Sequence, residues 1–243
     1  MEQALRFALV REVAGAGQDI RLDFDRKNQT SATVEASRNF ANKLWNATRF
    51  ALINLEDQDF ENLEQYDSSQ LQLSDKWILS RLARLNRETA NRYENYALGE
   101  AAKGLYEFAW NDFCDWYLEL IKRRLNSAKN LSPDELLDQK IAKSILYKVL
   151  SDLLIMLHPL MPHLTEELWH GLTGLTEDQL LALQPWPKLN EQDLNIDLEK
   201  SFSDLFVSIR LIRNLRAVAG LKPSQKAPVM LVSGKEALQN TLK

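Results

Sequence analysis

Glycine and proline are both scarce in this sequence, with 8 and 7 residues among 243. All-β folds need many tight turns, and dinucleotide-binding folds need glycine-rich loops, so both classes are disfavoured. No apolar run approaches the roughly 18 residues that cross a bilayer, so no membrane-spanning helix is expected. Long helices with few connections are the natural alternative.

Cys114 is the single cysteine, so no disulfide can form within the chain. This usage is typical of a protein in a reducing cytosol, and the apolar sequence around Cys114 predicts a buried structural thiol. The chain has 30 basic and 34 acidic residues and a net charge of −4. Because this field does not attract nucleic acid, any polyanion binding must come from a local basic patch.

Hydrophobic periodicity and capping signals predict a mainly α-helical chain. Ser132, Pro133 and Glu135 have the pattern of a capping box with proline at the first helical position. The predicted helices cover residues 2–13, 32–55, 74–94, 96–125, 132–158, 165–172 and 198–219. A polar loop is expected over residues 56–70, and residues 228–232 have strand character.

The apolar faces of the first and third helices follow from the same periodicity. They consist of Leu5, Leu9 and Val13 in the first helix and of Trp77, Ile78, Leu82 and Leu85 in the third. We expect an antiparallel helix bundle over residues 32–190. A connecting helix and loop over residues 1–31 precede it, and a small, incomplete α/β unit over residues 191–243 follows.

The helix that contains Arg38 to Phe50 has two different faces. At about 100° per residue, one apolar stripe predicts an ordinary core contact. That stripe consists of Phe40, Leu44, Ala47, Ala51 and Leu55. A second stripe aligns Asn39, Lys43, Asn46 and Phe50 away from the core, and Arg38, Asn42 and Arg49 border it.

This second stripe has the chemistry of an RNA-binding surface. An exposed ring such as Phe50 can stack on an unpaired base, amides can contact base edges, and cations can bind phosphate. The alternatives are that Phe50 packs against the first helix or the 56–70 loop, and that Lys43 is an ordinary surface lysine. Trp45 lies between the two stripes and is predicted to be a packing residue.

Other polar residues do not form a catalytic or metal site. Glu166 and Glu167 fit the first turn of a helix, where the dipole favours carboxylates. His158 and His163 are flanked by prolines, and no Cys supports them as zinc ligands. Arg210, Arg213 and Arg216 recur every third residue, so they either contact phosphate or form a solvated face. No nucleophile–base arrangement and no phosphate-binding glycine loop are present.

Four stretches together resemble the anticodon-binding domain of valyl-tRNA synthetases. Arg38 to Phe50 matches the pattern Arg-Asn-Phe-x-Asn-Lys-Leu-Trp-Asn-x-x-Arg-Phe of that family. Ala4 to Phe7, His158 to Trp169 and Arg213 to Pro223 also resemble its segments. The His158–Trp169 element is shared with isoleucyl and leucyl enzymes, whereas the Lys43–Asn46 core with Phe50 favours valyl enzymes.

The resemblance implies a helical bundle that binds the anticodon stem-loop of valine tRNA. Carried over by position, Lys43 and Phe50 contact anticodon bases. The helical stripe adds Asn39, Asn46, Arg38, Asn42 and Arg49 as further tRNA-binding residues. The remaining alternatives are the same domain of an isoleucyl or leucyl enzyme, and a helical module whose Phe50 stripe binds a protein helix.

The resemblance also implies that the parent enzyme attaches valine to its tRNA with ATP and Mg. His158–His163 and Lys222–Lys226 only superficially resemble its ATP-binding signatures, and the chain starts abruptly in helical pattern. We therefore expect a non-catalytic fragment without the catalytic and editing domains and without a cofactor or metal of its own. It is expected to be cytoplasmic and monomeric, with no DNA or membrane partner.

Overall fold

The structure is a computed structural model that describes residues 2–12, 23–27, 30–55, 67–125, 131–174, 179–222 and 224–228. Regular structure in these ranges is helical, apart from an isolated β-bridge between Asp25 and Thr30. Most of the strand predicted at 228–232 and most of the loop predicted at 56–70 lie outside the described residues.

The chain divides into two compact units, Met1–Leu194 and Asn195–Lys243. The first contains α1 (Glu2–Arg11), α2 (Ala32–Leu55), η2 (Ser68–Gln70), α3 (Leu73–Glu94), α4 (Leu98–Glu107), η3 (Phe108–Tyr117), α5 (Leu118–Leu125), α6 (Pro133–Leu157), α7 (Pro162–Thr173), η4 (Leu181–Leu183) and η5 (Glu191–Asp193). The second contains α8 (Ile196–Val218). The mainly α-helical class is confirmed.

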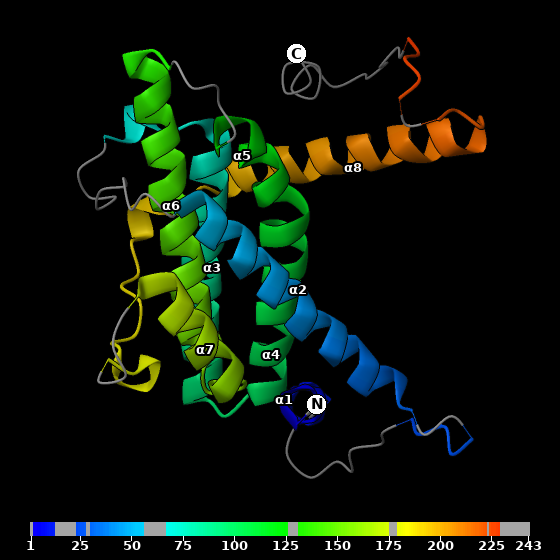
Figure 1. Ribbon diagram of the computed structural model, residues 1–243, viewed down its shortest axis with the longest axis vertical. Coiled ribbons are helices and arrows are strands. Elements are labelled where there is room, and N and C mark those ends of the chain that lie inside the picture. The colour runs from blue at the N-terminus through cyan, green and yellow to red at the C-terminus, as the bar shows by residue number, and fades with distance from the viewer. Residues whose placement is uncertain are drawn as a thin grey trace. The chain divides into compact units, whose positions relative to one another are not determined.

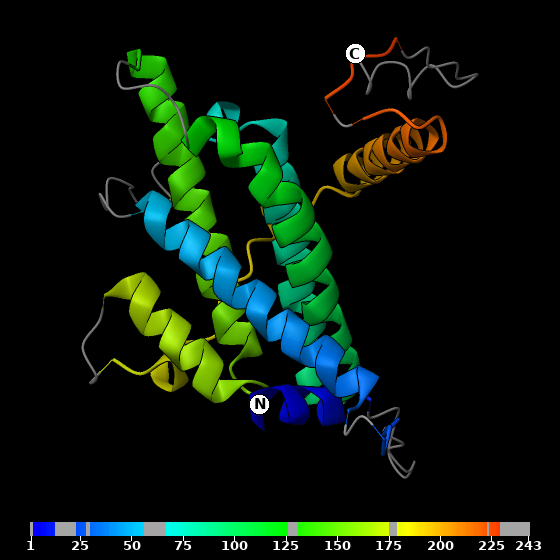
Figure 2. The same ribbon diagram turned by 45° about the vertical axis from the view of Figure 1, so that its right-hand side comes forward.

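The first unit is an antiparallel helix bundle, as predicted. The helix α3, the continuous α4–η3–α5 and the helix α6 run side by side in alternating directions, and α2 lies diagonally across them (Figures 1 and 2). The helix α1 packs on α2 and α4, whereas α7 packs on α6 and α2. In the described residues, no helix is both long and apolar enough to cross a membrane.

The predicted core faces of α2 and α3 are confirmed. Each predicted side chain is at most 5% exposed: Phe40, Leu44, Ala47, Ala51 and Leu55 in α2, and Trp77, Ile78, Leu82 and Leu85 in α3. Burying each of the leucine, isoleucine and phenylalanine side chains among them stabilises the fold by about 1.5–3 kcal/mol. The bounds predicted for α2 also agree with the structure.

The apolar face predicted for α1 is wrong at Leu5, whereas Leu9 is half-buried. Leu5 is 43% exposed, whereas Ala4, Phe7 and Ala8 are buried. Phe7 stacks on Phe40 of α2, with ring centroids 5.0 Å apart. The aromatic contact outweighs the leucine periodicity because Phe7 offers more apolar area to the neighbouring helix. Val13 lies outside the described residues.

The long helix predicted over residues 96–125 forms, but it begins two residues later and changes helical type along its length. Tyr96 has a left-handed backbone, with φ of 56°, and ends the turn that separates α3 from α4. Further on, Phe108–Tyr117 adopts a π-helix between α4 and α5. Because π-helical geometry is frequent at functional sites, this segment bears on the surface described below.

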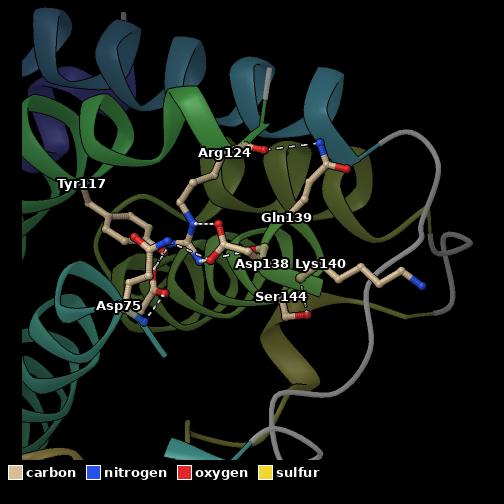
Figure 3. Close-up of polar contacts among 8 residues, drawn as sticks. Asp75, Tyr117, Arg124, Asp138, Gln139, Lys140 and Ser144 are labelled. Atoms are coloured by element: carbon tan, nitrogen blue, oxygen red, sulfur yellow. Dashed lines mark hydrogen bonds and ion pairs between the residues drawn. The ribbon is translucent and has the colours of Figure 1, made fainter. Parts of the chain in front are cut away.

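A buried ionic network ties the ends of three helices together (Figure 3). Arg124 of α5 lies 2.6 Å from Asp75 of α3 and 2.9 Å from Asp138 of α6. Tyr117 donates a hydrogen bond to the same Asp75 oxygen at 3.4 Å. Gln139 donates to the carbonyl of Arg124 at 3.3 Å, which caps the end of α5.

Local capping and backbone conformation fix the start of α6, as predicted, and the end of α8. Ser132 and Glu135 make the capping box of α6, and Trp169 of α7 is 6% exposed and faces inward. Gly220, which follows α8, has a φ of 67°. That backbone conformation is readily open to glycine, so the residue ends the helix.

Candidate functional site

The start of α2 is fixed by a carboxylate that precedes it in the chain. Asp23 accepts hydrogen bonds from the Ser31 hydroxyl at 3.2 Å, the Ala32 amide at 3.2 Å and the Thr33 hydroxyl at 2.9 Å. These bonds, led by the one from Thr33, lower the pKa of Asp23. An anionic side chain at a helix N-terminus also interacts favourably with the helix dipole.

The seven predicted tRNA-binding residues lie on the side of α2 opposite its core stripe. At about 100° per residue they span an arc of roughly 140°, centred about 150° from the middle of the core stripe. Five of them are exposed: Arg38, Asn39, Asn42, Asn46 and Arg49. Lys43 and Phe50 are half-buried, because they sit at the border between this face and the core face.

Lys43 is held by two residues of η3. Its ammonium lies 4.1 Å from the centroid of the Trp110 ring, a cation–π contact, and forms an ion pair with Asp115. The sequence predicted Lys43 as a site residue but missed both partners, since they lie more than sixty residues away in the chain. Lys43 is therefore neither an isolated surface lysine nor a side chain left free to rotate.

The Lys43 contact ends a row of aromatic rings in contact with one another. Phe40 and Tyr106 have centroids 5.0 Å apart, and Tyr106 stacks on Trp110 at 5.6 Å. The Arg11 guanidinium lies 5.1 Å from the ring centroid of Tyr106, the middle ring of this row. This row packs α2 against α4 and η3, so the position of Lys43 depends on the core.

Two other exposed apolar residues belong to α2. Trp45 is 46% exposed, so the prediction that it is a packing residue is only partly met. Ile53 is 60% exposed and lies on the same face as Asn42 and Asn46. The sequence reasoning missed Ile53, although the helical spacing that identified Phe50 extends to it.

His158 and Glu166 of the His158–Trp169 element have a structural role. Glu166 Oε1 accepts a hydrogen bond from the Leu181 amide at 2.7 Å and lies 3.1 Å from His170 Nε2. His158 Nδ1 lies 2.9 Å from the Thr165 hydroxyl. Burial lowers the pKa of His158, although Glu166 acts in the opposite direction. These contacts join the end of α6, α7 and η4.

No metal site is evident in the part of the chain that the structure describes, where no three His, Cys, Asp or Glu side chains gather closely enough. Cys114 is half-buried, and burial raises its pKa to about 12. At neutral pH this thiol is protonated and a poor nucleophile.

In the second unit, Arg216 donates to the carbonyls of Lys222 at 3.1 Å and Gln225 at 2.7 Å, so it holds the turn after α8.

Comparison with known proteins identifies the class. A family model described as the anticodon-binding domain of tRNA ligase matches residues 75–231. That match covers more than half of the chain, and the helix bundle agrees with it. The chain belongs to this family of anticodon-binding domains. The matched range starts after α2, so the candidate surface on α2 lies outside it.

Particular relatives narrow the comparison to one kind of tRNA ligase. The chain is 91% identical to a valine–tRNA ligase of Prochlorococcus marinus (strain NATL2A), over 98% of this chain and 26% of that protein. It is 49% identical to the valine–tRNA ligase of Synechocystis sp. (strain ATCC 27184 / PCC 6803 / Kazusa), over the same shares. The chain thus spans about a quarter of the length of the curated relatives it matches.

A solved structure has a similar fold. The LeuRS agnB2 of Agrobacterium radiobacter K84, solved in a ternary complex with tRNA and LeuAMS, matches with a TM-score of 0.53. The match covers 79% of this chain and 20% of that one, at 18% sequence identity. At this identity the likeness concerns the helical fold alone.

Proposed function

We propose that the exposed face of α2 binds the anticodon stem-loop of valine tRNA. The observation that carries this proposal is the position of Lys43, Asn46 and Phe50 on one face, opposite a fully buried core stripe. A half-exposed ring beside amide and ammonium donors matches the way single-stranded bases are stacked and hydrogen-bonded. The similarity to valine–tRNA ligases supports valine tRNA, rather than leucine or isoleucine tRNA, as the proposed ligand.

In this proposal the residues of the face have separate roles. Phe50 stacks on an unpaired base, and Lys43, Asn39 and Asn46 donate hydrogen bonds to base edges. Arg38, Asn42 and Arg49 hold the phosphate backbone. The chain performs recognition and takes no cofactor, while the parent enzyme attaches valine with ATP and Mg in another domain. That enzyme acts in the cytoplasm, as a monomer.

The experiment titrates valine tRNA into the 243-residue chain and, separately, into its Phe50→Ala and Lys43→Glu variants. Phe50→Ala lies outside the buried stripe, so we expect its unfolding midpoint to stay close to wild type. Lys43→Glu places a second carboxylate beside Asp115, so we expect its midpoint to fall modestly while the bundle stays folded. We expect each to weaken binding of valine tRNA, by about 1–3 kcal/mol for the lost stacking at Phe50. Tyr96→Ala and Lys103→Glu are controls outside α2, since they remove an exposed aromatic residue or reverse an exposed lysine.

Equal loss of affinity in the controls would contradict a site on this face. A second outcome is also informative, namely binding that is insensitive to salt. Phosphate contacts release counterions, so RNA binding weakens steeply as salt rises. Salt-insensitive binding of tRNA would instead contradict phosphate contacts by Arg38, Asn42 and Arg49.

A further inference from the structure

The ammonium of Lys43 is held on two sides by the π-helix η3. Trp110 lies beneath it and Asp115 pairs with it. In an α-helix, residues five apart point about 140° away from each other, so they could not both face one ammonium. In a π-helix, hydrogen bonds from residue i to i+5 place such residues about one turn apart. The π-helical backbone therefore makes this two-sided contact possible.

The ion pair changes what Lys43 offers to a ligand. The side chains remain partly accessible, at 25% for Lys43 and 47% for Asp115. A phosphate that approaches Lys43 also approaches the Asp115 carboxylate, so attraction and repulsion largely cancel. An uncharged acceptor, such as a base carbonyl or ring nitrogen, is not repelled in this way and can still accept from the ammonium.

The neighbours of Lys43 divide the face of α2 into two halves. On the side nearest Lys43 lie Asn39, Asn46 and Phe50, which carry no charge. Arg38 and Arg49 lie about 120–140° around the helix from Lys43. With Lys43 neutralised by Asp115, one half is electrically neutral and suited to bases, and the other half is cationic and suited to phosphate.

We infer that Asp115 is a specificity-determining residue of the tRNA-binding face, a role that rests on the proposed function. Its carboxylate prevents Lys43 from acting as a general phosphate-binding cation. Lys43 thereby contributes to the discrimination between bases rather than to non-specific attraction.

The test measures how strongly the chain and its Asp115→Asn variant bind two transcripts across a series of salt concentrations. One transcript is valine tRNA, and the other is the same tRNA with its anticodon changed. In the variant we expect the affinity for the changed tRNA to rise, by up to about fivefold. We also expect the salt slope to steepen by about one, because one more cation contacts phosphate. The ratio of the two affinities should fall.

Glu119→Gln is the matched control. It also removes one negative charge and the partner of a lysine, because Glu119 pairs with Lys122 on the next turn. We expect this variant to keep the wild-type ratio. In a Lys43→Ala background, Asp115→Asn should no longer change the salt slope, as a double-mutant cycle requires. Asp115→Ala is the second variant, if Asp115→Asn fails to fold.

The inference is overturned if Asp115→Asn and Glu119→Gln give the same ratio and slope, or if the effect persists without Lys43. Failure of the inference is distinguishable from failure of the proposed function. If only the inference about Asp115 fails, the wild-type chain still prefers valine tRNA. If the proposed function fails, the wild-type chain binds both transcripts equally.

Discussion

Phe7 of α1 stacks on Phe40 of α2, with ring centroids 5.0 Å apart and both side chains at most 1% exposed. This contact joins the first helix to the one that carries the candidate site. Phe40 in turn contacts Tyr106, and Tyr106 stacks on Trp110 beside Lys43. The aromatic row thus connects the outer helix α1 with the position of a proposed tRNA contact.

The substitution Phe7→Ala should destabilise the chain by about 3–5 kcal/mol, because it leaves a cavity in a fully packed region. The measurement is urea denaturation followed by far-UV circular dichroism. Leu5→Ala is the control on the same helix, and at 43% exposure it should cost below about 1 kcal/mol. If Leu5→Ala were the more destabilising of the two, the observed packing of α1 would be contradicted.

The bundle and its candidate face were largely predictable from local pattern. The core stripe of α2, from Phe40 to Leu55, is repeated at helical spacing and was predicted correctly. The capping box at Ser132 was also predicted, because such signals depend on residues three apart.

Features that depend on distant contacts or on small backbone changes were not predictable. The leucine periodicity of α1 misidentified its buried face, since Phe7 is placed by a partner more than thirty residues away. The segment Phe108–Tyr117 was predicted as part of an α-helix, so the sequence did not reveal that Trp110 and Asp115 share one side. Lys43 was singled out, but its partners were not.

Removing Arg124 tests the buried ionic network. Arg124→Ala leaves Asp75, whose side chain is fully buried, without its cation. An uncompensated buried charge is expected to cost about 3–5 kcal/mol. Arg123→Ala is the matched control, because Arg123 is the exposed neighbour of Arg124 and should shift stability by less than about 0.5 kcal/mol. Equal midpoints in urea denaturation for the two variants would contradict a structural role for this network.

Asp152 gives a pH-dependent prediction. Burial raises its pKa, and the Lys148 ammonium 2.9 Å away only partly opposes that effect. A carboxyl group with a raised folded-state pKa favours folding while it is protonated. That contribution is lost as pH rises from the unfolded value, about 3.8, through the higher folded value.

Asp152→Asn should therefore be more stable than wild type at neutral pH. The difference should shrink as pH falls towards the unfolded pKa, where the carboxyl group is neutral in both states. Urea denaturation of both proteins at several pH values measures it. A variant that is less stable at neutral pH would mean that the ion pair with Lys148 outweighs the cost of burial.

The capping box at Ser132 should stabilise α6 without affecting tRNA binding. The Ser132 hydroxyl accepts from the Glu135 amide at 3.3 Å, and Glu135 accepts from the Ser132 amide at 2.8 Å. Ser132→Ala should cost about 1 kcal/mol in unfolding free energy. Its affinity for valine tRNA should match wild type, because Ser132 does not belong to the proposed face of α2. A selective loss of tRNA affinity would place part of the site on α6.

The central claim is that the face of α2 distinguishes one anticodon from another. The most direct measurement is the ratio of dissociation constants of the wild-type chain for valine tRNA and for the same tRNA with a changed anticodon, at one salt concentration. We predict tighter binding of valine tRNA, with a ratio that falls towards one in Phe50→Ala. Equal binding of the two tRNAs by the wild-type chain would contradict base recognition by this surface.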